Sequence, residues 1–61
     1  MTSRPVLADY APYHKSSEFN RGIADYAAGR FTNPYVGVAA QAWDRGLEYA
    51  MRVARFTATE R

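Results

Sequence analysis

The chain has 61 residues, 48% hydrophobic and 15% aromatic, and its eight Lys and Arg against six Asp and Glu give a formal net charge of +2. A chain of this length is expected to form a single domain, and the absence of cysteine excludes disulfide bonds and thiolate metal sites. The small net charge is below the imbalance usual for a dedicated nucleic-acid-binding protein. Because so short a chain has little interior, we expect a partner or self-association into a homo-oligomer to stabilise it.

The sequence predicts a soluble protein of the cytoplasm. Residues 1–15 lack the apolar core of a signal peptide, and no run approaches the roughly 18 apolar residues of a membrane span. The absence of cysteine is typical of an intracellular setting. We therefore expect no membrane association.

Residues 1–15 are predicted to form an extended N-terminal arm, because they contain two prolines and no helical period. Residues 16–61 are predicted to form an all-α domain, a two-helix antiparallel hairpin whose second helix is the longer. The apolar residues Val6, Leu7 and Tyr10 are expected to fold back over the part of the second helix that the first helix leaves uncovered.

The first helix is expected to begin after Ser16 or Ser17, whose hydroxyl groups can accept hydrogen bonds from the free N–H groups of the first turn. Gly29 is expected to end it. The apolar residues between these signals recur at helical spacing and predict one buried stripe. They are Phe19, Ile23, Tyr26 and Ala27.

The sequence allows two start positions for the second helix. Asn33 followed by Pro34 is a typical capping pair, whereas the poor helix former Gly37 favours a start near Val36 or Val38. The segment that follows has the longest apolar stripe in the chain, and its tryptophan is expected to be core. The stripe consists of Val36, Ala39, Ala40, Trp43, Leu47, Ala50, Met51 and Ala54.

The two predicted helices differ in length, at about 12 and about 22 residues, or roughly 18 Å and 33 Å. We therefore expect Met51, Ala54 and Phe56 to extend beyond the first helix. Small residues, including Gly22 and Gly46, would let the helix backbones approach closely. A mid-helix glycine costs about 1 kcal/mol relative to alanine, so close contact would explain Gly46.

The sequence contains few residues suited to catalysis. The single histidine, His14, lies in the predicted arm, and the chain has no glycine-rich phosphate loop and no cluster of metal ligands. We expect no catalytic residue, no metal and no cofactor, so the predicted class is a non-catalytic binding protein.

Arginines and aromatic residues gather in the connection over residues 29–35 and along the second helix. Such a surface could stack unpaired bases and hold phosphates. The alternative, that the aromatic residues close the hairpin and the arginines form a solvated face, stays open. The predicted binding residues are Arg30, Phe31, Asn33, Pro34, Tyr35, Arg45, Arg52, Arg55, Tyr10 and Tyr13.

Four short motifs occur in order: Arg21-Gly22, then Ala27 to Arg30 (AAGR), then Asn33 to Tyr35 (NPY), then Ala42 to Ala50 (AWDRGLEYA). Over residues 19–52 this pattern resembles the ribosome modulation factor family, small bacterial proteins with related members in plasmids and phages.

The resemblance implies a two-helix protein that binds the small ribosomal subunit near the mRNA exit region, regulates translation and promotes the inactive ribosome dimers of hibernation. On this interpretation Trp43 and Gly46 support packing. The residues that would contact ribosomal RNA or protein are Arg30, Asn33, Pro34 and Tyr35.

The N-terminus departs from the family, whose type member opens with a strongly basic stretch. Here only Arg4 and Lys15 are basic, with Asp9 between them. Fewer charges mean less counterion release and weaker nonspecific affinity for RNA.

A second hypothesis is a protein-binding inhibitor or adaptor, bacterial or phage-encoded, that acts on a host protein. Its anchors would be the exposed aromatic residues Tyr10, Tyr13 and Tyr35, since tyrosine is favoured at interface hot spots. Binding to RNA should weaken with salt, whereas this protein–protein contact should depend on salt only slightly.

Overall fold

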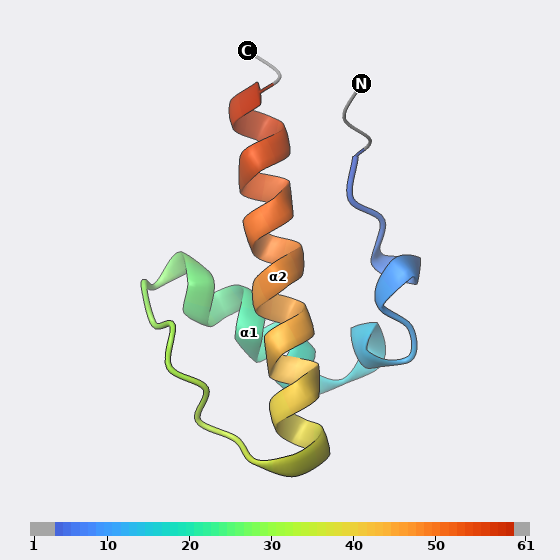
Figure 1. Cartoon of the computed structure of the whole chain (residues 1–61), viewed down its shortest axis with the longest axis vertical. Helices are drawn as coiled ribbons and strands as arrows, with labels where there is room; N and C mark the ends of the chain where they lie inside the picture. The colour runs from blue at the N-terminus through green and yellow to red at the C-terminus, as the bar shows by residue number, and fades with distance from the viewer. Residues whose placement is uncertain (1–3, 60–61) are drawn as a thin grey trace.

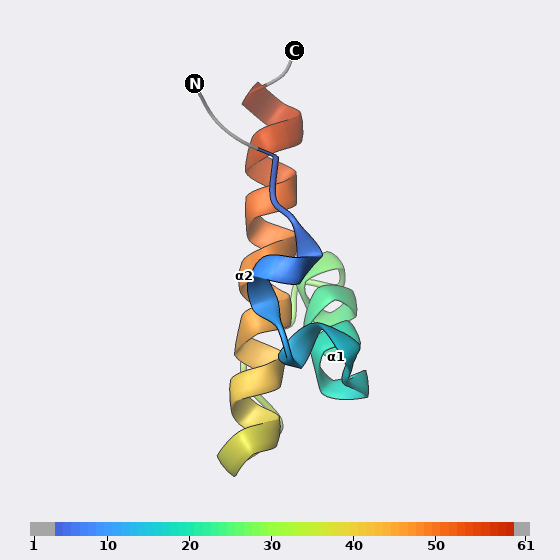
Figure 2. The same cartoon turned by 90° about the vertical axis from the view of Figure 1, so that its right-hand side faces the viewer.

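The computed structural model describes residues 4–59, which form two α-helices preceded by an N-terminal arm (Figure 1). Helix α1 spans Ser17–Ala27 and helix α2 spans Gly37–Thr59. The predicted all-α hairpin with an arm and a longer second helix is confirmed. The helices cross obliquely, so that α1 passes over the N-terminal half of α2 instead of lying along it as in an ideal antiparallel pair (Figures 1 and 2).

Helix α1 begins and ends where the sequence predicts. The Ser16 hydroxyl oxygen accepts a hydrogen bond from the backbone N–H of Phe19 at 3.1 Å, so Ser16 caps the first turn. At the other end Gly29 adopts a positive φ of 79°, and the N–H of Arg30 donates to the carbonyl oxygen of Asp25 at 2.7 Å. A left-handed residue followed by this backward hydrogen bond is a common helix stop.

Helix α2 begins at Gly37, so the later of the two predicted starts is right and the start at residues 33–34 is wrong. The reason is that Asn33 uses its side chain to shape the connection. Its Oδ1 accepts from the N–H of Tyr35 at 3.0 Å, and its Nδ2 donates to the carbonyl oxygen of Ala40 at 2.8 Å. These bonds tie the connection to the first turn of α2.

The helices cross at two glycines, and their backbones touch there. A Cβ atom on Gly46 would collide with the carbonyl oxygen of Phe19, and a Cβ atom on Gly22 would collide with the carbonyl oxygen of Trp43. The predicted close contact at Gly46 is therefore confirmed. Only glycine at both positions permits this approach.

The core is small and mainly aromatic. Phe19 and Trp43 are completely buried, and Tyr10 and Ala42 are buried beside them. Tyr10, Phe19 and Tyr49 form a cluster whose ring centroids are 5.6 to 6.0 Å apart, in the tilted and edge-on arrangements that aromatic pairs prefer. Trp43 is a core residue, as predicted.

The arm runs from α1 along α2 toward the C-terminal end of that helix (Figure 2). It is not extended throughout, because it contains two short 3₁₀-helices, Leu7–Tyr10 and Tyr13–Lys15. The predicted return of the arm over the second helix is correct in part. Tyr10 makes that contact, whereas Val6 and Leu7 remain exposed.

The C-terminal half of α2 is covered unevenly. Phe56 is half-buried and lines a cavity with Arg4 and Pro5 of the arm. Met51 and Ala54 are exposed, as expected for residues beyond the reach of α1. The arm therefore protects one side of this overhang and leaves the other open.

Tyr10→Phe should leave stability unchanged or raise it by up to about 1 kcal/mol. The Tyr10 hydroxyl group is buried and has no hydrogen-bond partner among the described residues, and burial raises its pKa. Removing it therefore loses no well-formed hydrogen bond, only a weak attraction between the hydroxyl oxygen and the Arg52 guanidinium. The free energy of unfolding in urea measures the change.

Tyr13→Phe is the matched control. The Tyr13 hydroxyl donates to Oε1 of Gln41 at 2.9 Å, so its removal should cost about 0.5 to 1 kcal/mol. A larger loss for Tyr10→Phe than for Tyr13→Phe would contradict the assignment of the Tyr10 hydroxyl as unpaired.

Candidate binding surface at the connection

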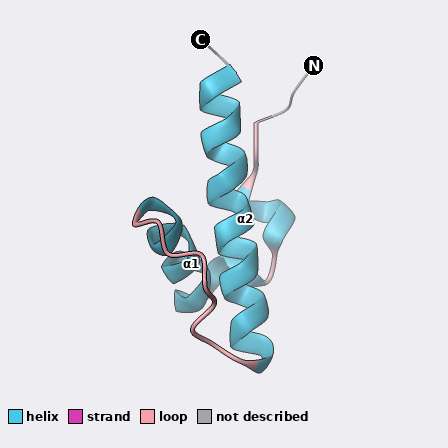
Figure 3. Cartoon of the chain, turned by 60° about the vertical axis from the view of Figure 1, so that its left-hand side comes forward, coloured by secondary structure: helices cyan, strands magenta, loops and turns pink. Residues whose placement is uncertain are grey.

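The connection, residues 28–36, runs along one side of the molecule from the end of α1 to the start of α2 (Figure 3). The arm lies on the other side of α2 (Figure 1). Most connection residues are exposed, and the hydrogen bonds of Asn33 hold the segment in place. It is therefore an ordered surface segment that a partner can reach.

Asp25 organises the start of this surface. It is only 2% exposed, and its Oδ2 accepts a hydrogen bond from Nε1 of Trp43 at 2.8 Å. Its Oδ1 accepts from Nε of Arg21 at 3.1 Å and lies 3.6 Å from Nη1 of Arg30. The indole hydrogen bond lowers the pKa of Asp25 most, the two arginines lower it further, and burial opposes them. The carboxylate is therefore ionised at neutral pH.

The two arginines that hold Asp25 still face the solvent. The side chains of Arg21 and Arg30 are 51% and 67% exposed, whereas the carboxylate between them is buried. Arg21, Arg30 and Asp25 together carry one net positive charge, and the exposed carboxylate of Asp44, which accepts a hydrogen bond from Nδ2 of Asn33 at 3.1 Å, adds a negative charge to the connection. Each guanidinium group therefore contacts Asp25 through one edge, and its other N–H groups are available to an anionic partner.

An exposed aromatic residue follows Arg30 in the chain. Phe31 is 63% exposed, and its ring packs edge-on against Tyr26 with centroids 5.8 Å apart. Pro34 is exposed, while Tyr35 is half-buried beside Asn33. Phe31 is therefore the ring of the connection best placed to stack on a partner.

The structure separates the other predicted arginines from this surface. Arg45 and Arg52 form ion pairs with Glu48 at 3.8 Å and 2.7 Å, and the Arg52 guanidinium lies 5.9 Å from the centre of the Tyr10 ring. They follow the arm side of α2. Arg55 lies one turn further along the same helix, toward the end of α2.

Two predicted tyrosine anchors are engaged inside the molecule. Tyr10 is buried in the core, so it is not an exposed anchor as proposed in the protein-binding hypothesis. Tyr13 is half-buried and bonded to Gln41. Sequence reasoning also missed Asp25, although its spacing of four residues from Arg21 was a signal for an ion pair.

Residues 4–59 contain no group of three or more His, Asp or Glu side chains placed to hold a metal ion. His14 is half-buried, and its Nδ1 has no hydrogen-bond partner among these residues. Neither α1 nor α2 combines the length and apolar character that crossing a membrane requires.

Compared with models of protein families, with curated proteins and with solved structures, the chain shows no match. The resemblance to the ribosome modulation factor family therefore stays a prediction from short motifs.

Proposed function

We propose that this protein is a non-catalytic binding protein that attaches to RNA of the small ribosomal subunit through the connection. One observation carries the proposal: Arg21 and Arg30 contact the buried carboxylate of Asp25 with their guanidinium groups exposed, and the exposed ring of Phe31 follows Arg30 in the chain. Exposed cations and an open aromatic ring are the features that bind unpaired nucleotides.

The arrangement suits phosphate. Each guanidinium has five N–H donors in a planar fork, and the contacts to Asp25 involve one nitrogen of Arg21 and one of Arg30. The remaining donors can bind phosphate oxygens in pairs. Because its hydrogen bond to Asp25 already orders the Arg21 side chain, that side chain loses less conformational freedom on binding than a free arginine would.

The resemblance to the ribosome modulation factor family supports the choice of RNA. The connection contains the motif residues Arg30, Asn33, Pro34 and Tyr35. The hydrogen bonds of the Asn33 side chain shape the segment that carries the other three. On this proposal the protein regulates translation by occupying the small subunit, and hibernation is the setting that the resemblance implies.

Arg30→Ala and Phe31→Ala should each weaken binding to purified small subunits about tenfold, measured by cosedimentation at low salt. Arg30 loses a phosphate contact and Phe31 loses a stacking surface, and both side chains are exposed enough for the fold to survive. Raised salt should weaken the wild type more steeply than Arg30→Ala.

Arg45→Ala is the charge-matched control, because Arg45 lies with Glu48 on another face of α2. It should reduce binding less than Arg30→Ala does. Failure of the wild type to cosediment at low salt, or an equal loss for all three variants, would contradict binding through the connection.

A second candidate is binding to a host protein. It is favoured by Val36 and Val38, which are strongly exposed where the connection enters α2, Val36 to 87%. Capture from lysate with and without nuclease separates the candidates. An RNA partner is lost on nuclease treatment, whereas a protein partner survives it and tolerates salt.

A further inference from the structure

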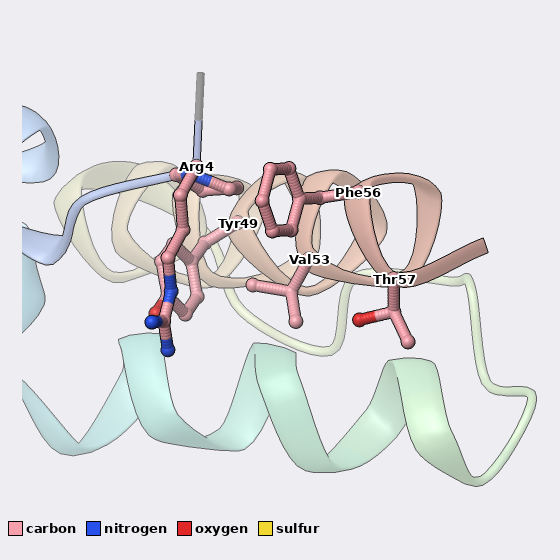
Figure 4. Close-up of a pocket in the computed structure, with 6 residues that line it drawn as sticks. Arg4, Tyr49, Val53, Phe56 and Thr57 are labelled. Atoms are coloured by element: carbon pink, nitrogen blue, oxygen red, sulfur yellow. The ribbon is translucent and has the colours of Figure 1, made fainter. Parts of the chain in front are cut away.

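A cavity of about 340 Å³ lies between the arm and the C-terminal half of α2 (Figure 4). It is on the other side of α2 from the connection, so the proposed RNA-binding surface does not use it. The residues that line it come from the start of the described arm and from three successive turns of the helix. They are Arg4, Pro5, Tyr49, Val53, Phe56 and Thr57.

The residues of α2 that line the cavity are mostly apolar. Tyr49, Val53 and Phe56 recur at spacings of four and three, so they share one stripe of α2, and Figure 4 shows them in succession along the helix. They present two aromatic rings and an aliphatic side chain. Thr57 adds a hydroxyl group at the far end.

Arg4 of the arm is the only charged residue among the described residues that line the cavity. Figure 4 shows the Arg4 side chain extending beside Tyr49, with its guanidinium group at the same end as the tyrosine hydroxyl. Within residues 4–59 no carboxylate lines the cavity and Arg4 forms no ion pair. A cationic end beside an apolar wall is complementary to a ligand with one anionic group and an apolar body.

We propose that this cavity binds a small carboxylic acid with an aromatic or aliphatic body. The carboxylate lies on the Arg4 guanidinium, which offers paired N–H donors, and the body packs against Val53 and Phe56. The volume is at the lower end of the range of roughly 300 to 1,000 Å³ for small-molecule sites, which fits a ligand of this size.

The binding of 3-phenylpropionate, followed by NMR titration of the full chain, tests this proposal. Chemical-shift changes should centre on Val53, Phe56 and Thr57 and should spare Arg30 and Phe31. The neutral 3-phenylpropionamide is the matched ligand control. It should bind at least about tenfold more weakly, since a hydrogen bond to a charged group is stronger than one between neutral groups.

Two variants locate the site. Arg4→Gln should weaken 3-phenylpropionate about tenfold while leaving the amide unchanged, whereas Arg45→Gln, a loss of the same charge elsewhere, should affect neither. Thr57→Phe, at an exposed position that can tolerate a ring, should fill the cavity and abolish binding of both ligands.

Several outcomes would overturn the proposal. They are an absence of shifts at Val53 and Phe56, equal affinity for acid and amide, and unchanged binding of the acid to Arg4→Gln. RNA binding is assigned to the connection and not to this cavity. These results would therefore not change the expected outcome of the cosedimentation experiment.

Discussion

Gly46→Ala is expected to remove most of the stability of the fold, although alanine is the better helix former by about 1 kcal/mol. The new methyl group would collide with the carbonyl oxygen of Phe19, and its neighbours there are backbone atoms that cannot rotate away. Forcing the helices apart would also loosen the packing of Trp43 and Tyr49. We expect a loss of about 3 kcal/mol, which is most of the stability that a chain of this size has.

The helical circular dichroism signal and its thermal midpoint measure this effect. Gly37→Ala is the control, because Gly37 has a positive φ of 67° but no other atom within 4 Å of the added methyl group. Its cost should be only the backbone strain of about 1 to 2 kcal/mol. If both variants melted at the same temperature, close helix contact at Gly46 would not be what holds the hairpin together.

Trp43→Phe is expected to cost at least about 2 kcal/mol at neutral pH, because it removes a buried hydrogen bond and part of the largest core side chain. The indole N–H is the largest cause of the lowered pKa of Asp25. Without it the carboxylate loses a bond that only its ionised form uses fully. The variant should therefore also respond less to acid.

The direction of the pH effect follows from the lowered pKa of Asp25. A carboxyl group with a lower pKa in the folded state stabilises the fold fully above its unfolded pKa of about 4, and this stabilisation is lost as the pH falls through the folded value. Urea unfolding at neutral pH and at successively lower pH should show the wild type losing stability over this acid range. Trp43→Phe should lose less over the same range.

Asp25→Asn tests the assignment, because it keeps a similar shape and an acceptor oxygen but cannot ionise. Its stability should lack the part of the acid response that comes from Asp25. An acid response identical in Asp25→Asn and the wild type would show that other carboxyl groups are responsible.

Much of the helical framework could be predicted from local residues. Ser16 and Gly29 bound α1 because a hydroxyl cap and a residue free to adopt positive φ act on their own neighbours. The stripe containing Trp43 predicted a long second helix by its spacing alone. Gly46 was informative because a glycine inside a long helix destabilises it, so its presence indicates close packing against another segment.

The start of α2 and the shape of the arm could not be predicted in this way. Asn33 has a side chain that suits either a helix cap or a turn, and its contact with Ala40 in the folded chain decides between them. From the sequence, Tyr10 could either fold back over the second helix or serve as an exposed anchor for a partner. It is buried because Phe19 and Tyr49 leave a space for its ring.

The sequence by itself determined the all-α class, the bounds of α1, the close approach at Gly46 and the presence of arginine and aromatic residues in the connection. These depend on local propensity and on periodicity, which act over a few residues. Only the tertiary structure decided which charges meet. It joined Arg21, Arg30 and Trp43 at Asp25 and placed Arg45 and Arg52 elsewhere, because such contacts depend on the angle at which two helices cross.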